Sequence, residues 1–462
     1  MKKKAVLSLC LLLIFTLLYT GCSVAVDNFS EPQSFSVSGI FSSNMVIQRN
    51  AEVPVFGSAE DGLEITVNFN GQTKNCKAEN GEWKVYLDKM DADSIGKTMT
   101  ITSSQGETSV FRNILVGEVW LCAGQSNMEW LVEYLEDSHA VNQVLEEAEN
   151  PMIRECRVIV EDFDEVRDEL PRQEWVKSSR ESIMSQSAYA SAFAQGLQKE
   201  LGIPVGVISI AKGSTRIERW IDGGSCFNSS IYPIMPFRFA GLLWYQGEHD
   251  CMQLADFKES YPVRFKRLCE LYREGFEYPE MPVIQTQLAG YMSSETEGSE
   301  AWADMQLLQV ELSKEIPDTY TVYNQDYGHK TNIHPAAKKL LGQRAANLAL
   351  EKIYGIEGIY GSSPSFKSAE ITQDGLIITF EDVHGELELA RYSFSYIQNL
   401  EACGGDMIYK SVKGKIYDKD KIIVDISEIE NIKSIKYCRD SYEIVNLCSA
   451  GVPVFNFEYT FY

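Results

Sequence analysis

The sequence predicts an α/β protein in which a mainly parallel sheet, covered by helices on both faces, is flanked by two β-sandwich-like domains. Strand-like apolar runs alternate with helical patterns over residues 113–355, and such alternation is typical of a three-layer α/β/α domain. Short alternating segments separated by turn residues occupy residues 35–112 and 356–462, as in small antiparallel domains. A chain of 462 residues is long enough for about three domains.

Residues 1–22 have the composition of an export signal. Three lysines precede an apolar run that is shorter than a membrane-spanning helix normally requires. Thr20, Gly21 and Cys22 follow this run. Small residues before a cysteine are typical of bacterial lipoprotein signals. We therefore expect an exported protein, at the cell surface or in the periplasmic or extracellular space, whose membrane attachment is a lipid on Cys22. The alternative is ordinary cleavage nearby, which would release the chain.

Charge and cysteine content exclude several kinds of site. The net charge of −24 argues against nucleic-acid partners, which need clustered Lys and Arg. Of the eleven cysteines, nine follow the signal, and none forms a C-x-x-C pair, so we expect no metal. Cys438 and Cys448 could pair in the last domain. No cofactor is expected either, and the oligomeric state stays open.

The expected strands follow from the distribution of β-branched and apolar residues. The N-terminal domain contains short alternating segments such as 64–69, 83–87 and 99–102, with turns at Asn70-Gly71 and Asn80-Gly81. The middle domain has strand candidates at 114–123, 205–210, 239–245, 283–288 and 320–323. Between them lie helical stripes, for example at 188–201, 257–271 and 305–312. The alternating pattern returns at 370–372, 376–380, 422–426 and 434–437.

The apolar run Ile114–Ala123 ends at Gly124, and a helical pattern begins directly afterwards. Ser126 therefore lies where a buried strand ends and a helix starts, beside backbone N–H groups that can stabilise an anion. A hydroxyl there can attack a carbonyl while those groups hold the oxyanion. The competing interpretation is that Ser126 only caps the helix.

The residues around Ser126 decide between these roles. Gly-Gln-Ser-Asn-Met-Glu-Trp at 124–130, preceded by Gly-Glu-Val-Trp-Leu-Cys at 117–122, resembles the nucleophile block of sialate O-acetylesterases and related carbohydrate acetylesterases of the SGNH (GDSL-like) hydrolase superfamily. Residues 45–49, 81–83 and 451–455 resemble other parts of the same family, so the resemblance spans nearly the whole chain after the signal. It implies a catalytic serine at Ser126 and the SGNH three-layer fold.

Of five histidines, His334 is the expected base. It precedes Pro335 at the start of a helical pattern, beyond the last predicted strand, and Ile-His-Pro followed by Lys338 resembles the family's catalytic-histidine block. The aspartate that relatives often carry shortly before this histidine is absent. We expect Glu248 to orient the ring, with Asp326 as the second choice and a serine–histidine dyad as the third.

The remaining site residues come from the ends of the other predicted strands, where ligands bind in parallel sheets. The resemblance implies that the oxyanion is held by the backbone N–H groups of Ser126 and Gly213 and by the side-chain amide of Gln246. Arg216 could face a substrate carboxylate, and Trp244 could stack on a sugar, as could Trp130, Trp220 and Trp302.

The expected activity is removal of O-acetyl groups from a carbohydrate through an acetyl-enzyme. The resemblance puts O-acetylated sialic acid first, with acetylxylan or another acetylated polysaccharide as the alternative substrate. Two other hypotheses remain: a non-catalytic carbohydrate-binding surface protein, and a different SGNH activity such as a lipase or thioesterase. The first would account for the missing aspartate, and the second would require a broad apolar groove.

Overall fold

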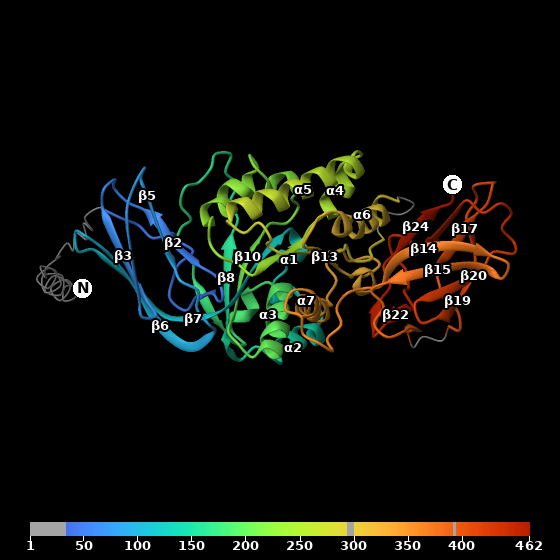
Figure 1. Ribbon diagram of the computed structural model, residues 1–462, viewed down its shortest axis with the longest axis horizontal. Coiled ribbons are helices and arrows are strands. Elements are labelled where there is room, and N and C mark those ends of the chain that lie inside the picture. Colours follow the sequence, from blue (N-terminus) through green and yellow to red (C-terminus); the bar gives the residue numbers. More distant parts are fainter. Residues whose placement is uncertain (1–33, 293–299, 391–393) are drawn as a thin grey trace, which may run out of the picture. The chain divides into compact units, whose positions relative to one another are not determined.

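A computed structural model describes residues 34–292, 300–390 and 394–462, and residues 35–462 form one compact unit (Figure 1). The expected signal at residues 1–22, including Cys22, lies outside the described residues. Within the described part of the chain, none of the helices combines the length and hydropathy needed to cross a bilayer.

The central sheet has the strand order β13-β12-β11-β7-β10-β8-β9. All neighbours along it are parallel except β8 and β9, which are antiparallel. The prediction of a mainly parallel sheet is thus confirmed. The strands are β7 (Thr108–Gly124), β8 (Asn150–Ile159), β9 (Trp175–Ser178), β10 (Val205–Ala211), β11 (Gly241–Tyr245), β12 (Val283–Thr286) and β13 (Thr319–Val322).

Seven α-helices of the described residues surround this sheet, with short turns of other helix types between them. Figure 1 shows α4 and α5 on one side of the strands and α2, α3 and α7 on the other. The α-helices are α1 (Ser126–Glu129), α2 (Ser138–Leu145), α3 (Ala188–Leu201), α4 (Glu248–Gln253), α5 (Phe257–Gly275), α6 (Ala301–Glu315) and α7 (Lys338–Lys352). The short turns are η1 (Val132–Tyr134), η2 (Ser182–Ser185), η3 (Ile217–Trp220), η4 (Phe227–Ile231), η5 (Tyr232–Ile234) and η6 (Gln325–Tyr327).

Helix α3 shows why the sequence begins and ends an element where it does. The Ser187 hydroxyl caps its N-terminus by accepting from the Ala190 N–H, and Gly202 ends it in the left-handed region at φ 65°. Small residues let α3 and α7 approach closely. A Cβ added to Gly342 of α7 would lie only 2.4 Å from the Cβ of Ala192 of α3, so only a glycine fits at that position. This contact fixes α7, whose first residues follow His334.

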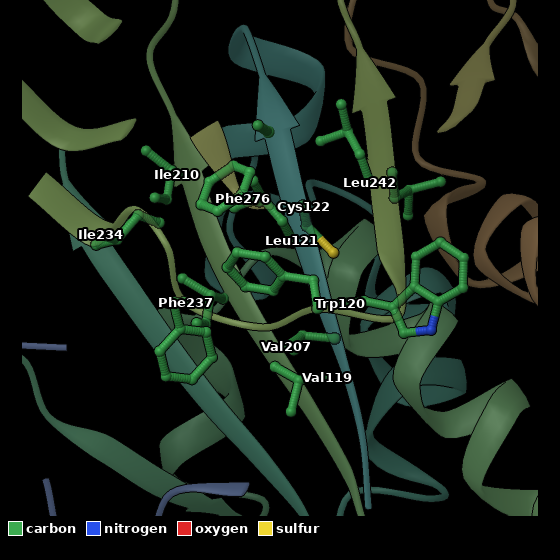
Figure 2. Close-up of a cluster of buried hydrophobic side chains, with 14 of the residues drawn as sticks. Val119, Trp120, Leu121, Cys122, Val207, Ile210, Ile234, Phe237, Leu242 and Phe276 are labelled. Carbon is green, nitrogen blue, oxygen red and sulfur yellow. The ribbon is translucent and has the colours of Figure 1, made fainter. Parts of the chain in front are cut away.

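The interior of the sheet is filled by large apolar side chains from adjacent strands. Figure 2 shows Val119, Trp120 and Leu121 of β7 in one cluster with side chains of β10, β11 and the segments that cover them. These β7 side chains are fully buried. Because both faces of the sheet are covered, a strand such as β11 is buried along its whole length, without the alternation of a half-exposed strand.

Strand β7 belongs to both the N-terminal and the central strands. Its first part pairs with β6 antiparallel and with β1 parallel, and its last part, Glu118–Gly124, pairs with β10. The expected domain boundary between residues 112 and 113 therefore lies inside a continuous strand. The other N-terminal strands are β1 (Val46–Gln48), β2 (Val53–Ser58), β3 (Glu64–Phe69), β4 (Gln72–Lys77), β5 (Glu82–Leu87) and β6 (Asp93–Ser103).

The C-terminal strands form two four-stranded sheets, β14-β15-β20-β19 and β18-β17-β21-β24, and a three-stranded sheet, β16-β22-β23. Side chains of the two larger sheets share one buried cluster, as in a sandwich. The strands are β14 (Ser365–Thr372), β15 (Gly375–Glu381), β16 (Leu387–Leu389), β17 (Leu400–Cys403), β18 (Lys410–Ser411), β19 (Lys413–Asp418), β20 (Lys421–Asp425), β21 (Ser434–Tyr437), β22 (Leu447–Ser449), β23 (Val452–Pro453) and β24 (Phe457–Thr460).

The cysteines of the described residues are all free thiols. The suggested pairing of Cys438 with Cys448 is therefore wrong. Cys438 is fully buried in the C-terminal apolar cluster, where it packs as a small apolar side chain.

Candidate active site

Ser126 lies at the carboxyl end of β7, in the turn that the sequence predicts. Gly124 has φ 146°, and a Cβ there would lie 2.1 Å from the Tyr245 carbonyl oxygen, so only glycine fits beside β11. Gln125 occupies the capping position of α1, and Ser126 is the first residue of the helix. The alternative role of Ser126 as a helix cap is thus excluded.

His334 lies against this serine. Its Nε2 is 2.9 Å from the Ser126 Oγ, the distance of a nucleophile–base hydrogen bond. The Asn332 side chain accepts from the His334 backbone N–H at 2.8 Å, so it fixes the backbone and not the ring. Burial, and secondarily the charge of Lys338, lowers the pKa of His334 to about 4. The imidazole is therefore neutral near pH 7 and able to accept a proton.

Glu248 is not the partner of the His334 ring. This buried carboxylate accepts from the Asn127 side-chain Nδ2 at 2.7 Å, and its other oxygen has no partner among the described residues. Burial raises the pKa of Glu248. Its expected role as the orienting acid of the ring is thus corrected: Glu248 contacts Asn127, the residue next to Ser126, instead.

The second choice, Asp326, is also engaged elsewhere. It accepts from both terminal nitrogens of Arg344, at 2.7 and 2.9 Å. Within the described part of the chain no carboxylate contacts the His334 ring, and the geometry is that of a serine–histidine dyad. The ring is held by stacking: the indole of Trp130 lies 3.9 Å from it, centroid to centroid.

The expected oxyanion donors are in different situations. Gly213 follows β10 as predicted, and a Cβ built on it would lie 3.4 Å from the Ser126 Cβ. Its backbone N–H, however, donates to the Glu129 carboxylate at 2.7 Å. The backbone N–H of Ser126 lies at the start of α1, where such groups have no partner within the helix.

The side-chain amide of Gln246 is not available as an oxyanion donor. Its side chain is fully buried, and its Nε2 donates to the Thr215 carbonyl at 3.0 Å and to the Asp250 carboxylate. The expected use of Gln246 as an oxyanion donor is corrected, because an NH2 group has two hydrogens and these partners already accept them. Gln246 instead connects the loops that follow β10 and β11.

Comparisons with known proteins identify the family of this chain. The model of the carbohydrate esterase family of sialic acid-specific acetylesterases matches residues 116–351, just over half of the chain, including Ser126 and His334. The chain belongs to this family. The match begins inside β7 and ends in α7, so it covers the central sheet.

Individual relatives are similar over different lengths. Human sialate O-acetylesterase is 26% identical over 284 residues, which cover 52% of this chain and 53% of that protein. The chain thus spans about half the length of this curated relative. Mouse sialate O-acetylesterase is 23% identical over 428 residues, 74% of this chain and 78% of that protein.

Among solved structures, a carbohydrate acetylesterase from Xanthomonas citri superposes with a TM-score of 0.83. The two chains are 25% identical, and the match covers 93% of this chain and 100% of the other. The similarity therefore extends beyond the central sheet to the flanking strands.

The two side chains expected to bind substrate differ in exposure. Trp244 is fully buried and packs edge-to-face on Trp220, which is also buried. Neither side chain can therefore stack on a sugar, and the expectation that they would is wrong. Trp302 is only 2% exposed. Arg216 is half-buried and pairs with Glu218 at 2.6 Å, so a substrate carboxylate would have to compete with that pair.

A cavity of about 250 Å³ opens beside His334. Trp130 and Tyr134 line it, together with Glu136, Asp137 and His329. Of the four tryptophans considered for sugar binding, Trp130 is thus the one that borders both His334 and a cavity. This cavity is the candidate position for the sugar ring.

Four functional neighbours escaped the sequence interpretation: Asn127, Glu129, Asp250 and Lys338. Asp250 accepts from Gln246 and from the Ile217 N–H, and burial raises its pKa to about 7. The sequence did contain one signal for these four residues, which is that each lies within four positions of Ser126, Gln246 or His334. Their partners are distant in sequence, so the contacts themselves leave no local pattern.

Proposed function

We propose that this protein is a serine esterase that removes O-acetyl groups from carbohydrates. The observation that carries the proposal is the 2.9 Å contact between Ser126 Oγ and His334 Nε2 at the carboxyl end of the central strand. The contact lies within the region that matches the family of carbohydrate esterases.

In the first half of the reaction, Ser126 Oγ attacks the acetyl carbonyl carbon while His334 Nε2 takes the hydroxyl proton. The carbonyl oxygen becomes an oxyanion, which the backbone N–H of Ser126 stabilises. The bond between the acetyl carbon and the sugar oxygen then breaks, and His334 gives its proton to that oxygen. The deacetylated sugar leaves an acetyl group on Ser126.

In the second half, a water molecule attacks the acetyl-enzyme and His334 takes its proton. The ester bond to Ser126 breaks, and the proton returns from His334 to Oγ, which releases acetate. Stacking on Trp130 keeps the imidazole plane fixed during both halves. Neutral His334 is the form that both proton abstractions need, and its low pKa favours that form.

The first substrate we propose is an O-acetylated sialic acid, since the human and mouse relatives are sialate O-acetylesterases. Arg216 is the residue that would meet the sialate carboxylate, after exchange of its pair with Glu218.

A second candidate is an acetylated neutral polysaccharide such as acetylxylan. The cavity beside His334 is lined by the carboxylates Glu136 and Asp137, and no lysine or arginine of the described residues lines it. Acidic walls repel an anionic sugar and tolerate a neutral one.

The test is acetate release by the purified protein from O-acetylated sialic acid, acetylated xylan and 4-nitrophenyl acetate. Ser126→Ala should lower kcat at least about a thousandfold. Ser313→Ala is the matched control, because that hydroxyl donates only to the Val310 carbonyl of its own helix. Absence of release from all three substrates would overturn the proposal and favour a carbohydrate-binding protein.

We further propose that residues 1–22 direct export and that Cys22 carries a lipid. The support is the sequence pattern alone. Mass spectrometry of the mature N-terminus tests it: a chain that begins beyond Cys22 would refute the anchor.

A further inference from the structure

Lys338 is a buried cation next to the catalytic serine. It is the first residue of α7, four positions after His334, and it is only 1% exposed. Its Nζ donates to the Asn127 side-chain Oδ1 at 2.5 Å and lies 5.4 Å from the centre of the Tyr245 ring. Among the described residues it forms no direct ion pair, which is unusual for a lysine buried this deeply.

Asn127 connects this cation to the rest of the site. It follows Ser126 directly and is 1% exposed. Its Nδ2 donates to the Glu248 carboxylate at 2.7 Å and to the Ile333 carbonyl at 3.0 Å, so its side-chain amide has partners at both ends. The Ile333 carbonyl belongs to the peptide bond that leads into His334. Asn127 thus joins the nucleophile's helix to the backbone of the base.

The two charges decide which way the Asn127 amide points. An ammonium group can only donate, so it must meet the amide oxygen, and a carboxylate can only accept, so it must meet the NH2 group. With Lys338 on one side and Glu248 on the other, the flipped amide would place donor against donor and acceptor against acceptor. The second N–H is therefore directed at the Ile333 carbonyl.

The charges of Lys338 and Glu248 also reduce the free-energy cost of burying each other. Burial lowers the pKa of Lys338 to about 7, and the nearby Glu248 carboxylate opposes this effect. Burial raises the pKa of Glu248, while the bond from Asn127 and the charge of Lys338 oppose that shift. Removing one charge leaves the other buried without its counter-charge, which is costlier than removing both.

We propose that Lys338 is a positioning residue for the proposed esterase reaction: with Glu248 it fixes the Asn127 amide, and Asn127 fixes the backbone that carries His334. This inference rests on the proposed function only for its kinetic consequence. The placement of His334 can be measured without turnover.

The kinetic experiment compares Lys338→Met, Glu248→Gln and the double variant in the full chain, with 4-nitrophenyl acetate as substrate. Lys339→Met is the matched control, because this neighbouring lysine binds Glu147 and Gln195 away from the serine. We expect Lys338→Met to lower kcat about tenfold or more with little change in KM. The double variant should be more active than Lys338→Met, since it leaves no unpaired buried charge. Wild-type kcat in a folded Lys338→Met protein, or strictly additive losses, would overturn the inference.

A second readout does not need activity. In a crystal structure of Lys338→Met, the contact between His334 Nε2 and Ser126 Oγ should be longer than 2.9 Å, because Asn127 no longer holds the Ile333 carbonyl in place. It should stay unchanged in Lys339→Met. If the wild type has no esterase activity but this contact lengthens in Lys338→Met, the proposed function fails and the placement of His334 by Lys338 stands. If the wild type is active and neither kcat nor this contact changes in Lys338→Met, the inference fails alone.

Discussion

The Trp130 indole lies nearly parallel to the His334 imidazole, with ring centroids 3.9 Å apart and planes inclined by 14°. Trp130 is the fourth residue after Ser126, so the same short segment supplies both the serine and the surface on which the His334 ring rests. This stacking fixes the orientation of the imidazole plane, as a hydrogen-bonded carboxylate does in a catalytic triad, but it adds no negative charge.

Trp130→Ala should therefore loosen the base and expose it. Because burial is the main cause that lowers the His334 pKa, exposure should raise that pKa towards its ordinary value of 6.5. We expect the acidic limb of kcat/KM against pH to move to higher pH and kcat to fall several-fold. Trp130→Phe, which keeps an aromatic face, should stay close to the wild type. An unmoved acidic limb in a folded Trp130→Ala protein would contradict this account.

The wild-type enzyme should keep its activity in mildly acidic solution. With a His334 pKa of about 4, the base stays neutral down to about pH 5, where an ordinary histidine would be mostly protonated. The measurement is kcat/KM for 4-nitrophenyl acetate between pH 4 and 8, after a check that the protein stays folded. A decline centred near pH 6.5 would show that the imidazole is not buried as described.

Glu129 offers a test of the oxyanion donors. Its carboxylate accepts from the Gly213 N–H at 2.7 Å, and a negative charge there opposes a developing oxyanion. If Gly213 is an oxyanion donor, Glu129→Gln should raise kcat/KM several-fold, because the charge is lost while the side chain keeps its size. Glu133→Gln on η1 is the exposed control. A tenfold fall in kcat would instead mean that Glu129 is needed to hold the Gly213 turn.

Glu155 should make stability depend on pH. It is buried in β8, accepts from the Ser191 hydroxyl, and has its pKa raised by burial to about 7. Between pH 4.5 and 7 the folded state therefore holds a proton that the unfolded state has released, so stability falls as pH rises through this window.

Glu155→Gln removes this titration. In urea unfolding the variant should be more stable than the wild type at pH 8, by up to about 3 kcal/mol for a shift of this size, and similar at pH 4.5. Glu200→Gln, at an exposed position of α3, should show no such difference between the two pH values. Equal stability of Glu155→Gln and wild type at pH 8 would refute the prediction.

The sequence was sufficient for the features that depend on local pattern. The apolar run before Gly124 predicts β7, and the residues after each predicted strand do gather at one edge of the sheet, including Ser126 and Gly213. His334 was singled out by the short local pattern Ile-His-Pro followed by Lys338, although α7 begins at Lys338 and not at Pro335 as expected.

The errors have a different origin. Trp244 lies in β11, which is buried on both faces, and apolar composition alone does not separate such a tryptophan from one that lines a cavity. Glu248 and Gln246 follow a strand as expected, but their partners Asn127 and Thr215 come from other strand ends. Which of several polar groups meet at a sheet edge depends on side-chain direction, which the sequence pattern does not encode.

The continuity of β7 bears on how this protein can be divided. The same backbone segment closes the N-terminal strands and forms the middle of the catalytic sheet, so a cut between residues 112 and 113 would sever a strand within one run of hydrogen bonds. Each fragment would expose backbone N–H and C=O groups that are paired in the intact chain. Such exposed strand edges promote aggregation. The N-terminal strands should thus melt together with the catalytic sheet in a single transition, and a shortened enzyme made for biotechnology would have to begin before β1.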